Sequence, residues 1–101
     1  MTIIKGTTPT ISFSYSDIDV SNITVAVLTI KQNNQKKIER TLETATVGEK
    51  MVSWTLSQAE TLSLADMHCV ICCDWKLASG VRGRSNVLTA NVEESGKNEV
   101  I

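Results

Sequence analysis

Five stretches of the sequence alternate apolar and polar residues with a period of two. Successive side chains of an extended strand point to opposite faces, so this period is typical of strands with one buried face. Thr, Val and Ile occupy 31 of the 101 positions, and β-branched side chains favour pleated surfaces over helices. The sequence therefore predicts a small all-β domain. The apolar members are Ile11, Phe13 and Tyr15; Ile23, Val25, Val27, Leu28 and Ile30; Val52, Trp54 and Leu56; Cys69, Ile71, Cys73, Trp75 and Leu77; and Leu88, Ala90 and Val92.

One short helix is expected between the third and fourth of these stretches. Ser57 precedes Glu60 by three positions, the spacing of a capping box in which each side chain bonds the other residue's backbone N–H. A helix near residues 57–64 would carry the chain from one sheet to the other, as in Greek-key sandwiches. The length suits one domain. We expect a β-sandwich over residues 1–95 and a polar C-terminal tail over residues 96–101.

The clearest local pairing is a hairpin of residues 23–31 with residues 35–44. Its turn is expected at residues 32–34, because Asn tolerates the left-handed conformation that tight turns require. The apolar phase changes between Val27 and Leu28, which indicates a β-bulge or a strand buried on both faces. We interpret it as a central strand near a bulge. Residues 2–5 are expected to form a short edge strand.

The apolar phase also predicts which side chains fill the core. Both tryptophans alternate in step with apolar neighbours, and large aromatic side chains stabilise a core when they are buried. An exposed indole would instead stack on a sugar ring, so a carbohydrate-binding module for attachment to a host surface stays the alternative function. The predicted core residues are Phe13, Val25, Trp54, Leu56, Ile71, Cys73, Trp75 and Leu88.

The three cysteines, Cys69, Cys72 and Cys73, fall in one predicted strand that begins at His68. C-x-x-C spacing occurs in zinc sites, but strand residues three apart face opposite sides and lie about 10 Å apart. An odd, clustered set is not a disulfide framework and suits a reducing compartment. A catalytic histidine needs a nucleophile and an orienting acid nearby, and the sequence shows no such set. We therefore predict a non-enzymatic protein without metal or cofactor.

Charge argues against nucleic acid and membranes as partners. Ten Lys and Arg against eleven Asp and Glu give a net charge of −1, so no overall field attracts anionic partners. The apolar runs are far shorter than the roughly 20 residues that span a bilayer, and no secretory signal is visible. Basic residues concentrate on the predicted hairpin, where charges on an edge strand commonly prevent sheet-to-sheet association. The same residues are the candidate partner-binding edge: Lys31, Lys36, Lys37 and Arg40.

Several segments resemble a group of short proteins encoded among the structural genes of tailed phages and prophages. The matching segments are the start, residues 5–13 (KGTTPTISF); residues 56–62 (LSQAETL), where the group has a Leu-Thr-Gln-Glu-Glu-Thr-like segment; a final strand over residues 85–92; and the closing residues 98–101 (NEVI). That group is similar in architecture to the immunoglobulin-like N-terminal domain of baseplate upper proteins. Two antibody hallmarks are missing here, since all cysteines share one strand and no Tyr stands two residues before a Cys.

The resemblance implies an immunoglobulin-like Greek-key sandwich of about seven strands. It also implies a non-enzymatic virion structural or assembly protein, an adaptor associated with the baseplate or tail that acts through protein–protein contacts. The expected partners are other virion proteins and, in the assembled particle, other copies of the chain. We expect the protein in the bacterial cytoplasm during assembly and then in the virion.

Overall fold

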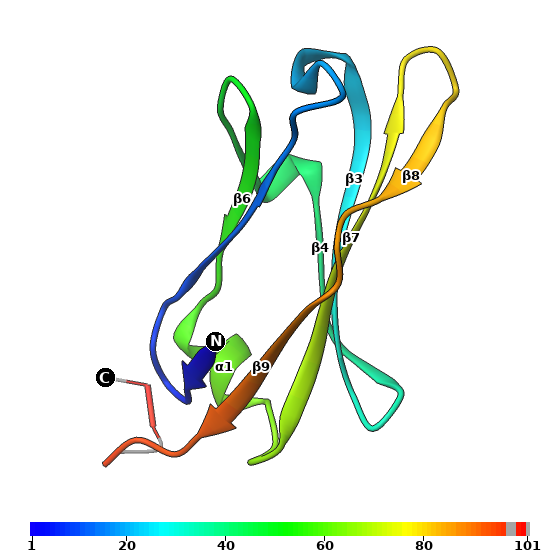
Figure 1. Ribbon diagram of the computed structural model, residues 1–101. Helices are drawn as coiled ribbons and strands as arrows, with labels where there is room; N and C mark the ends of the chain where they lie inside the picture. The colour runs from blue at the N-terminus through cyan, green and yellow to red at the C-terminus, as the bar shows by residue number, and fades with distance from the viewer. Residues whose placement is uncertain (97–98, 101) are drawn as a thin grey trace.

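Strands dominate the computed structural model, which describes residues 1–96 and 99–100. Within those residues nine strands form two sheets, and one α-helix and two short 3-10 helices connect them (Figure 1). The strands are β1 (Thr2–Ile4), β2 (Thr10–Ser14), β3 (Ile23–Gln32), β4 (Gln35–Thr41), β5 (Thr46–Val47), β6 (Met51–Thr55), β7 (His68–Leu77), β8 (Arg82–Arg84) and β9 (Leu88–Glu93). The helices are α1 (Gln58–Leu62) and the 3-10 turns Val20–Asn22 and Leu42–Thr44.

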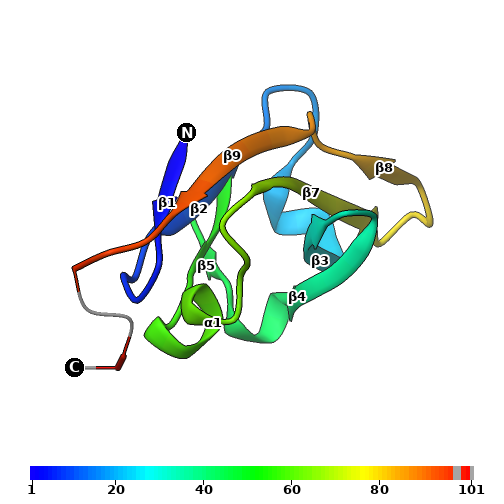
Figure 2. The same ribbon diagram turned by 90° about the horizontal axis from the view of Figure 1, so that it is seen from below.

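The two sheets form a Greek-key β-sandwich. The larger sheet has the order β1-β9-β7-β3-β4, with β8 also paired to β7, and the smaller has the order β2-β6-β5. All pairs are antiparallel except β1 with β9, which lie side by side in Figure 2. Seven of the nine strands are those expected from the sequence. The two additional strands are β5, which has two residues, and β8. Strand β8 lies where a connection was expected, and it contains Gly83.

The predicted hairpin is confirmed, with a shorter turn. Asn33 and Asn34 both have positive φ, 50° and 64°, as a two-residue type I′ turn requires. Gln32 was placed in the turn by the sequence, but it is the last residue of β3 and only 2% exposed. β4 ends at Thr41, and residues 42–44 form a 3-10 turn instead of continuing the strand.

Buried side chains from both sheets fill the space between the layers. Trp54 is 1% exposed; its indole N–H donates to the Thr41 carbonyl at 2.9 Å, and its ring meets Phe13 edge-on with centroids 6.3 Å apart. Of the predicted core residues, Phe13, Trp54, Leu56, Ile71 and Cys73 are buried, whereas Trp75 and Leu88 are partly buried and pack against this core.

The assignment of Val25 to the core is wrong, because its side chain is 46% exposed. The register between β3 and β7 shifts between Ile23 and Val25, so a bulge lies there and not at residues 27–28. An extra residue in one strand reverses the side-chain phase beyond it. Ala26, 1% exposed, takes the inward position, and Leu28 continues the phase.

Hydrogen bonds within the connection from β6 to β7, and from it to β3, hold this segment in place. The predicted capping box is present: Ser57 Oγ accepts from the Glu60 N–H at 3.1 Å, and Glu60 Oε1 accepts from the Ser57 N–H at 2.9 Å. The buried Gln32 amide donates to the carbonyls of Ala65 and Met67 at 2.8 and 3.3 Å and accepts from the Ala65 N–H at 2.8 Å. These bonds fasten the crossover segment to the larger sheet.

The boundary predicted at residue 95 stays a prediction. The predicted tail includes residues 97–98 and 101, which lie outside the described residues. No helix in the described part of the chain is long and apolar enough to cross a membrane.

Candidate functional site

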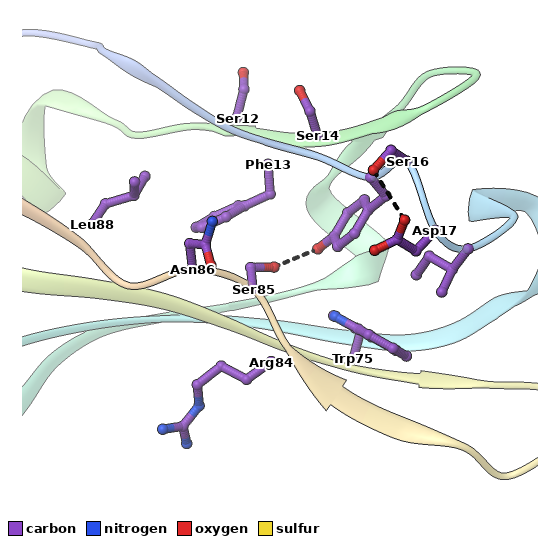
Figure 3. Close-up of a pocket in the computed structure, with 12 residues that line it drawn as sticks. Ser12, Phe13, Ser14, Ser16, Asp17, Trp75, Arg84, Ser85, Asn86 and Leu88 are labelled. Carbon is purple, nitrogen blue, oxygen red and sulfur yellow. Dashed lines mark hydrogen bonds between the residues drawn. The ribbon is translucent and has the colours of Figure 1, made fainter.

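One side of the sandwich is open between β2 and the segment that joins β8 to β9. β2 ends the smaller sheet, and β1 pairs with β9 only over residues 91–93. Beyond β1 the two sheets enclose a groove with a volume of about 380 Å³ (Figure 3). We call it the side groove; its lining includes Phe13, Tyr15, Trp75, Ser85, Asn86 and Leu88. This is the candidate functional site.

The interior of the side groove is aromatic. Figure 3 shows Phe13 pointing into the groove from β2, while Ser12 and Ser14 point away from it. The Tyr15 and Trp75 rings meet edge-on with centroids 6.3 Å apart. Such edge-to-face pairs favour a fixed arrangement of the rings, so the aromatic side chains beside the groove are held in place.

Three polar side chains, those of Tyr15, Ser85 and Cys73, meet at the inner end of the groove. The Tyr15 hydroxyl lies 2.8 Å from Ser85 Oγ and 3.4 Å from Cys73 Sγ. Burial raises the pKa of the Tyr15 phenol well above its ordinary value, and burial likewise raises the pKa of the Cys73 thiol. Both groups therefore keep their protons at neutral pH, and the inner end of the groove is uncharged.

One rim of the groove is the free edge of β2. The Tyr15 N–H donates to the Lys50 carbonyl and the Leu56 N–H to the Pro9 carbonyl, both at 2.9 Å. Backbone groups alternate in direction along an antiparallel strand, so those at positions 11 and 13 also point to β6. The N–H and C=O groups of Thr10, Ser12 and Ser14 therefore point to the opposite edge, where no strand of the described chain pairs with β2.

The other rim is the start of β9, which begins at Leu88. The Asn91 N–H donates to the Met1 carbonyl at 3.0 Å, and the Lys5 N–H donates to the Glu93 carbonyl at 2.9 Å. By the same alternation, the backbone groups of Thr89 point to the open side beyond Met1. Val87, the residue before β9, is 52% exposed. The unpaired edge of β2 and the start of β9 thus flank the side groove.

The candidate partner edge that the sequence indicates lies elsewhere, on β3 and β4. The Arg40 side chain bonds within the chain: it donates to Glu60 Oε1 at 2.7 Å and to the Thr55 carbonyl at 3.2 Å, which joins β4 to α1. Lys36 pairs with Glu39 at 2.7 Å, whereas Lys31 and Lys37 are exposed. This edge is strongly charged and is separate from the side groove.

The cysteines do not come together as a metal site would require. Cys69 and Cys73 are fully buried between the sheets, and Cys72 lies on the opposite face of β7. All three are free thiols, and His68 is exposed where β7 begins. Over residues 1–96 and 99–100, no three His, Cys, Asp or Glu side chains gather as metal ligands.

Sequence reasoning did not select the β2 edge. The signal that could have found it is the lack of any charged residue from Thr10 to Tyr15, since exposed edges usually carry such protection.

Comparison with known proteins bears on the fold. No family model matches the sequence, and no curated protein matches it. A crystal structure of a strand-swapped dimer of the immunoglobulin-like domain of mouse leukocyte-associated immunoglobulin-like receptor 1 is similar, with a TM-score of 0.53 and 18% sequence identity. The match covers 92% of this chain and 86% of that one. Together with the sheet order, it confirms the predicted all-β, immunoglobulin-like sandwich.

Proposed function

We propose that this chain is a non-enzymatic structural or assembly protein of a phage or prophage particle, an adaptor of the baseplate or tail that acts through protein–protein contacts. The observation that carries this function is the side groove beside the unpaired edge of β2. An unpaired edge offers a row of backbone donors and acceptors that a partner's strand can use. The groove beside it, lined by aromatic and polar side chains, adds surface that a partner can contact.

Two further observations support this function. The sequence segments that resemble phage structural proteins include residues 5–13, which contain most of β2, and residues 85–92, which contain most of β9. These are the strands that form the rims. The immunoglobulin-like receptor domain that shares the fold was crystallised as a strand-swapped dimer, which is an association through strands in that protein.

Site-specific crosslinking in particle-producing cells tests this function. A photo-crosslinking amino acid at Val87, the exposed residue just before β9, is compared with one at Ser79, an exposed residue between β7 and β8. We expect the chain in purified particles or assembly intermediates, with products from Val87 that contain a baseplate or tail protein. The control at Ser79 should lack them. If particles and intermediates lack the chain, or Val87 yields only non-virion proteins, the function is wrong.

Carbohydrate binding is a second candidate, favoured by one observation. Trp75 and Tyr15 line the groove together with Ser85 and Asn86, whose side chains can bond sugar hydroxyls. Trp54 cannot contribute, because it is 1% exposed. Titration with oligosaccharides of glucose, galactose and N-acetylglucosamine should then change tryptophan fluorescence saturably, and Trp75→Phe should abolish the change. A flat titration with all three would exclude these sugars as ligands.

A further inference from the structure

The strands that end a sheet differ in how well they are protected from pairing with another molecule. β4 carries Lys36 and Lys37 side by side, and β1 and β5 are only three and two residues long. β2 spans five residues, TISFS, without a charge or an internal proline. Natural edges are usually protected by charges, prolines or short length. β8, which pairs only with β7 in the described chain, is three residues long and carries two arginines. Of these edge strands within the described residues, β2 therefore has the least protection.

The free backbone groups of β2 suit pairing with a second copy of the same strand. They belong to Thr10, Ser12 and Ser14, which are spaced evenly about Ser12. In an antiparallel pair, residues whose N–H and C=O groups face each other exchange both hydrogen bonds. A two-fold axis at Ser12 would set Ser12 opposite its own copy and Thr10 opposite Ser14 of the other copy. All three pairs would then be hydrogen-bonded.

Charge selects this strand for self-association. Both copies contribute the same surface patch to a two-fold contact, so a charged strand edge faces an edge of the same charge. Two β4 edges would bring lysines against lysines, and like charges in opposing positions destabilise a pair. Two β2 edges bring hydroxyls against hydroxyls, and such side chains can bond each other. Within the chain, Thr10 and Thr55 already do so across β2 and β6, with hydroxyl oxygens 2.9 Å apart.

The same arrangement sets the side grooves of the two copies beside each other. A two-fold axis normal to the smaller sheet leaves both larger sheets on one side of the extended sheet, so the two open sides face each other. Phe13 would then lie opposite Ile11 of the other copy on the inner face of the extended sheet. Both side chains are already buried within their own chain, so the backbone hydrogen bonds are the main contribution of this contact.

We propose that two copies of this chain form a symmetric dimer through antiparallel pairing of their β2 strands, centred on Ser12. The paired edges join the two smaller sheets into one continuous sheet. This dimer can form whether or not the chain belongs to a virion. It extends the proposed function by naming a second copy of the chain as the partner of the β2 edge.

Sedimentation equilibrium on the full chain tests the dimer. A contact of one strand is small, so dissociation constants from about 1 µM to 1 mM are the range to cover. Ser12→Lys places two like charges at the axis, and Ser79→Lys adds the same charge between β7 and β8. Wild type and Ser79→Lys should approach twice the chain mass of 11.0 kDa, whereas Ser12→Lys should weaken association at least tenfold. A wild type that stays monomeric throughout, or equal association of the two variants, overturns the proposal.

A second pair of variants locates the axis. Ser12→Cys should form a disulfide between copies on mild oxidation, because the Cα atoms of a hydrogen-bonded pair lie about 5.5 Å apart, within disulfide range. The native thiols are buried, and Ser79→Cys is the exposed control. A dimer in which Ser12→Cys crosslinks no better than Ser79→Cys would place the contact elsewhere and overturn the proposal. If the sedimentation or the disulfide experiment fails, the Val87 crosslinks to virion proteins still test the proposed function separately.

Discussion

Replacing Gln32 by alanine is expected to destabilise the fold more than any other exchange of a polar residue at the hairpin. The Gln32 amide makes three hydrogen bonds to Ala65 and Met67, and the residue is 2% exposed. A typical internal hydrogen bond contributes about 1 kcal/mol net, and a buried group left unpaired costs about 1–3 kcal/mol. Some of the freed groups can regain water by movement of the crossover segment. We therefore expect the free energy of unfolding to fall by about 2–4 kcal/mol.

Urea unfolding followed by tryptophan fluorescence measures this loss. The midpoint should fall with the slope m unchanged, and the melting temperature should drop by roughly 10–25 °C for a chain of this length. Gln35→Ala is the matched control, since Gln35 pairs with Gln32 across the turn and is exposed. It should change stability by less than about 0.5 kcal/mol. A Gln32→Ala variant within the same limit would refute the reasoning.

Gln32→Glu separates hydrogen bonding from packing. An ionised carboxylate would face the carbonyl oxygens of Ala65 and Met67, whereas the protonated form can donate to one of them. The pKa of the introduced carboxyl should therefore rise above its unfolded value of about 4.3. The stability of this variant relative to wild type should then be greatest below that pH and be lost as the pH rises. Equal relative stability at about pH 4 and pH 7 would contradict this.

Three further predictions concern Trp75, the thiols and Tyr15. Gly83→Ala would place a Cβ 2.3 Å from the Trp75 ring, so the indole must move at a cost of about 1–3 kcal/mol; an unchanged near-ultraviolet circular dichroism spectrum would contradict this. Cys69 and Cys73 are fully buried and burial raises the pKa of both, so a disulfide reagent should modify them only on unfolding, and rapid reaction of the native protein would count against it. Burial also raises the pKa of Tyr15, so the unfolded chain loses this proton at a lower pH than the folded one. Stability should fall by up to about 1.4 kcal/mol per pH unit above about pH 10, and Tyr15→Phe should reduce that slope in thermal melts.

Local interactions were predictable from the sequence. Asn33 and Asn34 determine their turn through their own tolerance of positive φ, and Ser57 and Glu60 cap α1 through bonds three residues apart. The alternation of apolar residues likewise identified the main strands, because each strand has one buried face. These signals need no knowledge of what lies elsewhere in the chain.

Features that depend on distant neighbours were not predictable. Val25 is exposed because a bulge against β7 reverses the phase of β3, and the sequence does not mark the bulge position. Gln32 resembles a turn residue, yet its amide is required by a segment that is more than thirty residues away in sequence. The side groove exists because β1 covers only part of β9, and the uncharged residues of β2 do not by themselves show that its edge is left unpaired.

The parallel pairing of β1 with β9 has a consequence for how the molecule is made. Thr2 lies opposite Asn91, so β1 finds its place only after residue 91 has left the ribosome. Contacts between such remote segments form slowly, since the loop between them must close first. The Ile3 side chain, 1% exposed in the finished sheet, therefore stays uncovered during translation, and shortening the chain before residue 91 should leave the N-terminus susceptible to proteases.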